Sequence, residues 1–299
     1  MKNALLSSVA LLALFNHAIA ADLPNKKSVE TTSAPIWTGL YAGVNTGAIW
    51  GNPSNAQAAS YTLVSGAPNY SLIDAALLSG STGALSGRLG FIGGGQIGYN
   101  YQLYQRFVVG GEADFQGIAG SNASANKWNT AQDGFTDYGG GTNSTFYVLS
   151  NQQVSTSQTW LGTVRGRVGY LLMQNLLVYG TGGLAYGGVN TTISNTQLFT
   201  KVAQGAGNPG GERGFTTGNS STSSTLVGYS AGGGVEWMFL PNWSAKAEYL
   251  YYNLGNVSGT STNIYYPTGQ AVSMEPVKLF STTNYQHNVS GNIIRAGVN

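Results

Sequence analysis

The segment WLGTVRGRVGYLLMQNLLVYGTGGLAYGGV, residues 160–189, carries the pattern that decides the fold. Val164 and Val168 fall on one side of its first half, and Arg165 falls on the opposite side. Period-two alternation of this kind is typical of a β-strand with one apolar and one polar side. Residues 173–175 (Met-Gln-Asn) break the pattern before a second alternating run begins. The segment therefore predicts two antiparallel strands joined by a tight turn.

The same alternation recurs along the chain, with connections that are alternately long and short. The predicted strands are 37–50, 85–101, 106–117, 158–170, 176–189, 225–239, 243–254 and 286–299. Long connections rich in Asn, Ser, Thr and Gly are expected at 51–84, 118–157, 190–223 and 255–285, and short ones near 102–105, 171–175 and 240–242. This arrangement predicts an all-β fold, an eight-stranded antiparallel transmembrane β-barrel with four long extracellular loops and both termini in the periplasm.

The composition favours the same fold class. Charged residues make up 8% of the chain, against about 25% in a typical soluble domain. A soluble β-sandwich would carry many charges on its outer face, whereas the polar sides here hold mainly glycine and small polar residues. The absence of cysteine excludes disulfides and thiolate metal sites. The net charge of +2 gives no reason to expect a nucleic-acid partner.

The N-terminus resembles an export signal. Lys2 precedes a short apolar run from Leu5 to Phe15, and residues 18–20 (Ala-Ile-Ala) form a small-residue cleavage site. We therefore expect a signal peptide at 1–20, a flexible periplasmic lead-in at 21–35, and the outer-membrane β-barrel at 36–299. The alternative is an uncleaved anchor, but the apolar run is too short to span a bilayer.

Charged residues in the predicted strands all fall on the polar side. Facing lipid at mid-depth, an Arg or Lys would cost about 2–4 kcal/mol. The interior of an eight-stranded barrel is only wide enough for side chains to fill it, so charges there must pair. We expect a closed, salt-bridged interior; the alternative is a cationic ring that selects anions. The predicted network is Arg88, Glu112, Asp114, Arg165, Arg167, Glu236, Lys246, Glu248 and Arg295.

Tryptophans lie at the ends of the predicted strands. In transmembrane barrels these positions form the aromatic girdle at the two membrane interfaces. The predicted girdle is Trp37, Trp50, Trp160, Trp237 and Trp243.

Several motifs suggest chemistry that their context does not support. Residues 93–98 match G-x-G-x-x-G but lie within a strand and lack a following helix, so glycines that make room for interior side chains are the better interpretation. His287, the only histidine after the signal peptide, is expected at an interface or in a loop. Asp133 and Asp137 could form a carboxylate pair but are expected to be solvated loop charges. The sequence thus predicts no catalytic residue, metal site or cofactor, and no enzyme.

The strand segments resemble a known family. Among them are PIWTGLYAGVNTGAIWG (35–51), GFIGGGQIGYNYQ (90–102), VGGEADFQG (109–117), VGYSAGGGVEW (227–237) and HNVSGNIIRAGVN (287–299). They are similar to the small alphaproteobacterial outer-membrane β-barrel proteins, which include surface antigens and are related to opacity proteins and the barrel of outer-membrane protein A. The resemblance implies an eight-stranded barrel at the cell surface. Members usually end in aromatic-x-Phe, whereas this chain stops at Asn299, so a truncation or an altered insertion signal is expected.

The function expected from these observations is a structural surface protein that supports the envelope and presents loops. The expected partners are outer-membrane lipids, lipopolysaccharide and, during insertion, the barrel-assembly machinery; the sequence does not identify a loop partner. One alternative is a narrow porin. Another is haemin or host-surface binding, because tyrosine can ligate haem iron. The aromatic loop residues available for haemin are Tyr61, Tyr70, Trp128, Phe135, Tyr138, Phe146 and Tyr147.

Overall fold

The computed structural model describes residues 37–62, 83–87, 89–104, 106–136, 143–204, 213–268 and 279–299. All of them belong to one compact unit, Pro35–Asn299. The predicted signal peptide (1–20) and lead-in (21–35) lie outside the described residues and stay predictions. In the described part of the chain, no helix is long and apolar enough to cross a membrane.

The described residues form eleven β-strands, and every pairing between them is antiparallel. A tight turn at Gln174–Asn175 and another at Pro241–Asn242, where Asn242 has φ +66°, join neighbouring strands at one end. The strands are β1 (Gly39–Gly51), β2 (Ser54–Thr62), β3 (Gly83–Gly87), β4 (Leu89–Leu103), β5 (Phe107–Ala119), β6 (Asn122–Thr136), β7 (Asn143–Met173), β8 (Leu176–Gln204), β9 (Arg213–Leu240), β10 (Trp243–Thr268) and β11 (Leu279–Val298).

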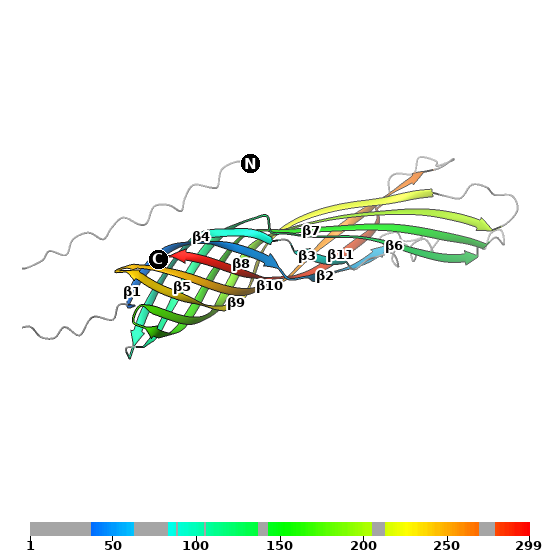
Figure 1. The fold of residues 1–299 in the computed structure, drawn as a ribbon. Helices are drawn as coiled ribbons and strands as arrows, with labels where there is room; N and C mark the ends of the chain where they lie inside the picture. Colours follow the sequence, from blue (N-terminus) through cyan, green and yellow to red (C-terminus); the bar gives the residue numbers. More distant parts are fainter. Residues whose placement is uncertain are drawn as a thin grey trace, which may run out of the picture. The chain divides into compact units, whose positions relative to one another are not determined.

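Eight of these strands close a barrel (Figure 1). The order around the ring is β1, β4, β5, β7, β8, β9, β10 and β11, and β11 then pairs with β1. The closing register sets Val44 beside Val298 and Gly51 beside Gly291. Closure pairs backbone groups that would be costly to leave open in hydrocarbon. The eight-stranded antiparallel barrel predicted from the sequence is confirmed.

The wall continues past this ring at the end opposite the tight turns. There β2, β3 and β6 replace β1, β4 and β5, so the order becomes β7, β8, β9, β10, β11, β2, β3 and β6. The changeovers lie at Asn52–Pro53, between β3 and β4, and at Gly120, which has φ +77°. We call this part of the wall the outer extension: residues 54–62, 83–87, 122–136, 143–157, 190–204, 213–224, 255–268 and 279–290.

The outer extension corrects the predicted loop boundaries. Most described residues of the expected loops 51–84, 118–157, 190–223 and 255–285 lie in strands. Their outer sides are mainly polar, and their inner sides mix polar residues with buried apolar ones, so they show no regular hydropathy alternation; the buried apolar residues are Ala56, Leu85, Ala125, Val154, Ile193 and Tyr285. Side-chain pairs across the strands help to hold the ladder: Asn151 Nδ2 donates to Asn126 Oδ1 at 2.7 Å, and Thr260 Oγ1 donates to Asn284 Oδ1 at 3.0 Å.

The ring strands have an apolar outside and a polar inside. On β7, Val164 and Val168 are 52% and 63% exposed, whereas the alternating Arg165 and Arg167 are buried. A band of exposed apolar side chains suits the hydrocarbon of a bilayer. Other exposed members of this band are Leu40, Val44, Phe91, Ile97, Phe115, Leu184, Val227, Val235, Tyr249 and Ile294.

Candidate functional site

Eight charged side chains from five strands meet inside the barrel, and each is no more than 5% exposed. Their alternation with the outward apolar residues turns all of them toward the lumen. Four are anionic and four are cationic, so the cluster has no net formal charge. The members are Glu112 and Asp114 on β5, Arg165 and Arg167 on β7, Glu236 on β9, Lys246 and Glu248 on β10, and Arg295 on β11.

Arg165 lies at the centre of this charge cluster. Its Nη2 is 2.6 Å from Glu112 Oε1 and 2.9 Å from Asp114 Oδ2, and its Nη1 is 3.0 Å from Glu248 Oε1. Its Nε donates to Thr163 Oγ1 at 2.8 Å. One planar guanidinium thus bridges carboxylates from β5 and β10, as its fork of donors allows.

Two further cations tie β11 and β10 to the same carboxylates. Arg295 Nη2 is 2.9 Å from Asp114 Oδ2, and Arg295 Nε donates to Glu248 Oε2 at 2.7 Å. Lys246 Nζ is 2.9 Å from both carboxylate oxygens of Glu112. The charges therefore form one network across the lumen.

Arg167 extends the network toward the tight turns. Its Nη2 lies 2.6 Å from Glu236 Oε2, and its guanidinium carbon lies 4.0 Å from the ring centroid of Tyr179. Tyr41 accepts a hydrogen bond from Arg167 Nη1 at 3.0 Å and donates one to Glu112 at 2.7 Å. Charge-assisted bonds from Nη1 and Nη2 and a cation–π contact thus hold this guanidinium, whereas its buried Nε has no hydrogen-bond partner among the described residues.

Inward-facing glycines lie opposite charged residues where the backbone of the paired strand comes close. Gly183 pairs with Arg165, and a Cβ at Gly183 would lie 2.2 Å from the carbonyl oxygen of Val164. Gly47 pairs with Arg295, and a Cβ there would lie 2.6 Å from Arg295 Cα. In the predicted stretch 93–98, a Cβ at Gly98 would lie 2.4 Å from the ring of Tyr41, which agrees with the interpretation of these glycines as space for interior side chains.

Apolar side chains border the charge cluster on both sides along the lumen, a feature that the sequence analysis missed. The position of Ile92 in the sequence could have revealed this feature, because strand alternation places Ile92 on the same side of β4 as Gln96, which faces the interior. Toward the outer extension lies the inner apolar layer, formed by Ile49, Ile92, Leu161, Ala185, Val189, Leu250, Tyr252, Leu254 and Ile293. Toward the tight turns lies the turn-side cluster, formed by Trp37, Val108, Leu171, Leu177 and Tyr179.

Eight of the nine predicted network residues come together in this cluster. Arg88 is outside the described residues, so its place in the network stays a prediction. Arg106, next to a turn, is exposed and donates to Tyr170 Oη at 3.0 Å.

The girdle prediction is wrong for Trp37. This residue is 5% exposed, packs with the turn-side cluster, and donates from Nε1 to the carbonyl oxygen of Gln174 at 2.9 Å. It precedes β1, so strand alternation does not fix its direction, and burying the indole with its N–H satisfied is favourable.

The other four tryptophans occupy outward positions. Trp237 and Trp243 are exposed on either side of the turn at Pro241–Asn242. Trp160 stacks on Phe115 with ring centroids 5.4 Å apart, and Trp50 is partly buried beside outward-facing Leu89. Their role as a membrane girdle stays a prediction.

Few of the aromatic residues considered for haemin have described side chains. Trp128 on β6 is 59% exposed and Tyr147 on β7 is 48% exposed. The side chains of Tyr61, Tyr70, Phe135, Tyr138 and Phe146, and those of Asp133 and Asp137, fall outside the described set.

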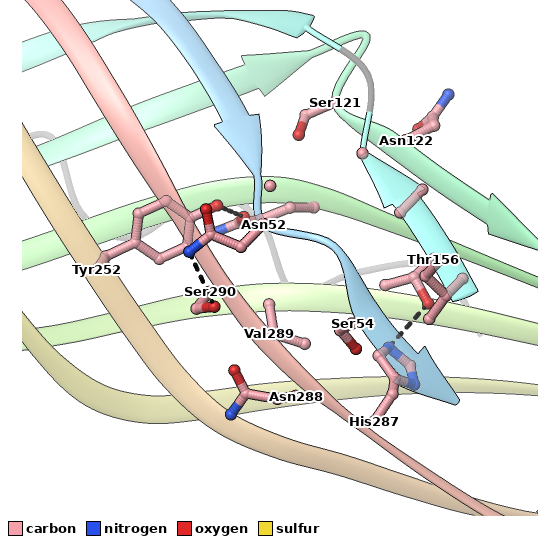
Figure 2. A pocket seen from close by; sticks show the side chains of 15 residues that line it. Asn52, Ser54, Ser121, Asn122, Thr156, Tyr252, His287, Asn288, Val289 and Ser290 are labelled. Carbon is pink, nitrogen blue, oxygen red and sulfur yellow. Dashed lines mark hydrogen bonds between the residues drawn. The ribbon is translucent and has the colours of Figure 1, made fainter. Parts of the chain in front are cut away.

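His287 is buried, which corrects the expected interfacial or loop position. It lies on β11 within the outer extension, where its Nε2 is 3.0 Å from Thr156 Oγ1 (Figure 2). The interior of the outer extension holds buried polar side chains such as Thr156 and Thr191, so it accommodates an imidazole that a loop would leave in water. Burial lowers the pKa of His287 to about 4, so this ring is neutral near pH 7.

Comparison with known proteins gives matches to outer-membrane proteins. A family model described as the outer membrane protein beta-barrel domain matches residues 7–268. A 31 kDa outer-membrane immunogenic protein of Brucella melitensis is 32% identical over 262 residues, which cover 85% of this chain and 88% of that protein. A 22 kDa outer membrane protein of Rhizobium leguminosarum is 31% identical over 160 residues, 53% of this chain and 51% of that protein. These names describe outer-membrane and immunogenic proteins rather than enzymes.

Solved structures give weaker likenesses. Ail, the attachment invasion locus protein of Yersinia pestis, shares 11% identity and has a TM-score of 0.26, with 86% of this chain and 99% of that chain covered. The outer membrane protease OmpT of Escherichia coli shares 10% identity and has a TM-score of 0.22, with 84% and 96% covered.

Proposed function

The chain belongs to the outer membrane protein β-barrel family, and from that premise we propose that it is a structural surface protein with a lumen closed to solutes. Its membrane is the cell outer membrane, as for its relatives. In this role the barrel anchors the outer extension at the surface and supports the integrity of the envelope. No step of this function requires a catalytic group or a cofactor.

The observation that carries the proposal is the filling of the lumen. The charge cluster crosses the lumen and pairs its cations with its anions, and apolar side chains lie on both sides of it. A hydrated ion on this route would have to separate buried ion pairs and then lose its own water against apolar side chains. Both steps are costly, which favours a plug over a pore.

The proposed orientation rests on the unequal ends of the barrel. Tight turns join strands at one end, whereas the wall continues as the outer extension at the other. In barrels of this class short turns are periplasmic and long connections are extracellular. We therefore place both termini in the periplasm and the outer extension outside the cell. The apolar band would then contact lipid and lipopolysaccharide after the barrel-assembly machinery has inserted the strands.

Conductance tests the closed lumen. The full-length protein, refolded into planar bilayers, should show no stable current steps, while a general porin in the same bilayers gives open-channel steps. Insertion is verified separately by the gel-mobility difference between heated and unheated samples. Stable steps from the inserted protein would overturn the plug and favour the narrow porin.

A second measurement addresses haemin. Trp128 and Tyr147 are exposed on neighbouring strands of the outer extension, but the register does not pair them directly. We expect haemin titration to leave the Soret band unchanged. A saturable Soret shift that Tyr147→Phe abolishes would instead support the haemin alternative.

A further inference from the structure

A pocket passes into the barrel wall where the ring changes into the outer extension. Gly51 and Asn52 line it at the end of β1, and Ser121 and Asn122 line it at the changeover from β5 to β6 (Figure 2). Inward side chains close its deep side, including Tyr252 of the inner apolar layer. We call this feature the wall pocket. It lies where the ring strands, which carry the outward apolar band, give way to the outer extension.

Three polar atoms that line the wall pocket have no hydrogen-bond partner in the structure. They are Ser54 Oγ, Gln158 Nε2 and His287 Nδ1. Gln158 is 7% exposed and His287 is 4% exposed, so bulk water does not readily satisfy these two. Buried polar groups left unpaired cost about 1–3 kcal/mol each, which makes their clustering in one pocket informative.

The hydrogen bonds that these side chains already make determine which donors and acceptors remain for a ligand. Gln158 Oε1 accepts from Tyr252 Oη at 2.9 Å, which leaves the amide N–H as a donor. His287 Nε2 is engaged with Thr156, so Nδ1 is the open nitrogen. A neutral imidazole nitrogen donates or accepts according to its tautomer, and a serine hydroxyl can do both. The pocket therefore offers one fixed donor and two groups that can adapt.

The chemistry of the lining favours an uncharged ligand. All fifteen described residues that line the wall pocket are uncharged types, and burial keeps His287 neutral near pH 7. These described residues thus offer a bound ion no counter-charge, and its desolvation would be uncompensated. A hydroxyl group both donates and accepts, which matches the mixture of fixed and adaptable partners.

The size of the pocket limits the ligand further. Its cavity volume is about 50 Å³. A single water needs roughly 10–15 Å³ by this kind of measure, so the space suits a few waters or one molecule with a three-carbon backbone. Apolar contacts are available from Leu85, Val289 and the ring of Tyr252.

We propose that the wall pocket binds a small neutral polyol through Ser54, Gln158 and His287. The ligand would be free glycerol or the hydroxyl-bearing edge of a neutral glycolipid headgroup at the membrane surface. This inference does not depend on the proposed closure of the lumen, because the wall pocket lies on the side of the inner apolar layer that faces the outer extension.

The ring signals of His287 provide a direct test. The full-length protein in detergent micelles, labelled with ¹⁵N-histidine, has two histidines, and His287→Gln identifies the signal of interest. Titration with glycerol should shift the His287 nitrogens saturably, with a dissociation constant in the millimolar range expected of so small a ligand. Propan-1-ol, which lacks the additional hydroxyls, and acetate, which is charged, should give no saturable shift.

Two variants remove the proposed contacts separately. Gln158→Met and Ser54→Val should each weaken glycerol binding at least tenfold. Thr191→Val is the matched control, because Thr191 bonds to Thr156 but does not line the pocket, and it should leave binding within twofold. Gel mobility of unheated samples verifies that each variant is folded. The two variants are independent of each other. If one of them fails to fold, the other still tests the proposal.

Three results would overturn the proposal: a shift linear in glycerol concentration, equal shifts with propan-1-ol or acetate, or unchanged binding in both contact variants. Each would mean that the pocket does not recognise a polyol through these side chains. Experiments in lipid nanodiscs then distinguish the two possible sources of the ligand. A shift caused by a neutral galactolipid, but not by phosphatidylcholine, assigns a headgroup, whereas a shift with free glycerol alone assigns a soluble polyol.

Discussion

At the level of single residues, Arg165 joins carboxylates from strands on different sides of the lumen. Glu112 and Asp114 come from β5, which neighbours β7, whereas Glu248 comes from β10, three places further around the ring. Removing one charge would therefore leave several carboxylates with too few partners in a place that water cannot easily reach. The cost lies in the uncompensated charge rather than in the energy of any one pair.

The first prediction concerns this residue. Arg165→Met keeps an unbranched side chain in place of the arginine stem but removes the charge, so the free energy of unfolding should fall by about 3–5 kcal/mol. Urea unfolding in lipid vesicles, followed by tryptophan fluorescence, measures the change.

The double variant Arg165→Met/Glu248→Gln should recover part of this loss, because it removes one of the stranded charges. Arg106→Met is the control, since Arg106 is exposed, and it should change stability by no more than about 0.5 kcal/mol. Equal losses for Arg165→Met and Arg106→Met would show that the interior pairs contribute nothing specific.

The second prediction uses two adjacent glycines on β8. A Cβ at the inward Gly183 would lie 2.2 Å from a backbone oxygen, whereas a Cβ at the outward Gly182 would lie 3.6 Å from its nearest neighbour. Gly183→Ala should therefore lower the free energy of unfolding by about 1–3 kcal/mol through overpacking. Gly182→Ala should be neutral or slightly stabilising. Similar stabilities of the two variants would contradict the tight fit beside Arg165.

At the level of elements, the ring strands and the outer extension follow different rules. Ring strands alternate between lipid-facing apolar residues and lumen-facing polar or small ones, as β7 does around Arg165. In the outer extension the outer side carries mainly Ser, Thr and Asn with a few exposed apolar residues such as Leu149 and Leu198, and the inner side is mixed, so no regular period-two hydropathy pattern arises. Backbone pairing and polar cross-strand contacts hold these strands instead.

Hydrogen exchange tests the outer extension. Amides of residues 190–200 pair with β7 on one side and with β9 on the other. They should exchange at least about a hundredfold more slowly than in the unfolded chain, because exchange requires local opening of the ladder. Mass spectrometry of peptides from this range, with an acid-unfolded sample as reference, gives the ratio. Amide exchange near the rate of the unfolded chain would instead mean that residues 190–200 form a loop, as the composition suggests.

The contrast between the ring strands and the outer extension explains which parts of the fold could be predicted from the sequence. The ring strands and the lumen-facing charges follow from alternation alone, because lipid outside and a narrow interior leave little choice. The partners of each charge do not follow: Arg295 meets Asp114 across 181 positions of chain, and only the register of the closed ring determines that contact. Trp37 and His287 were misplaced because neither a strand start nor a polar lumen has a hydropathy signal.

At the level of the whole molecule, the outward band should determine where the barrel sits in the membrane. Val168 belongs to the band, whereas Ser258 is an exposed residue of the outer extension. Val168→Arg should lower folding stability in bilayers by about 2–4 kcal/mol, because the charge would face hydrocarbon. Ser258→Arg should change it by no more than about 0.5 kcal/mol.

Refolding yield and urea midpoints in vesicles measure both changes. A penalty for Ser258→Arg equal to that for Val168→Arg would mean that the hydrocarbon covers the outer extension as well.

The pairing of β11 with β2 has a consequence for recognition by antibodies. Residues 281–286 lie beside residues 57–62 in the outer extension, although more than two hundred positions separate them in the chain. A binding footprint on this side would span both segments, so the epitope would be discontinuous. Serum raised against linear peptides would recognise the unfolded chain far better than the intact cell surface, and boiled antigen would lose the determinants that the native surface displays.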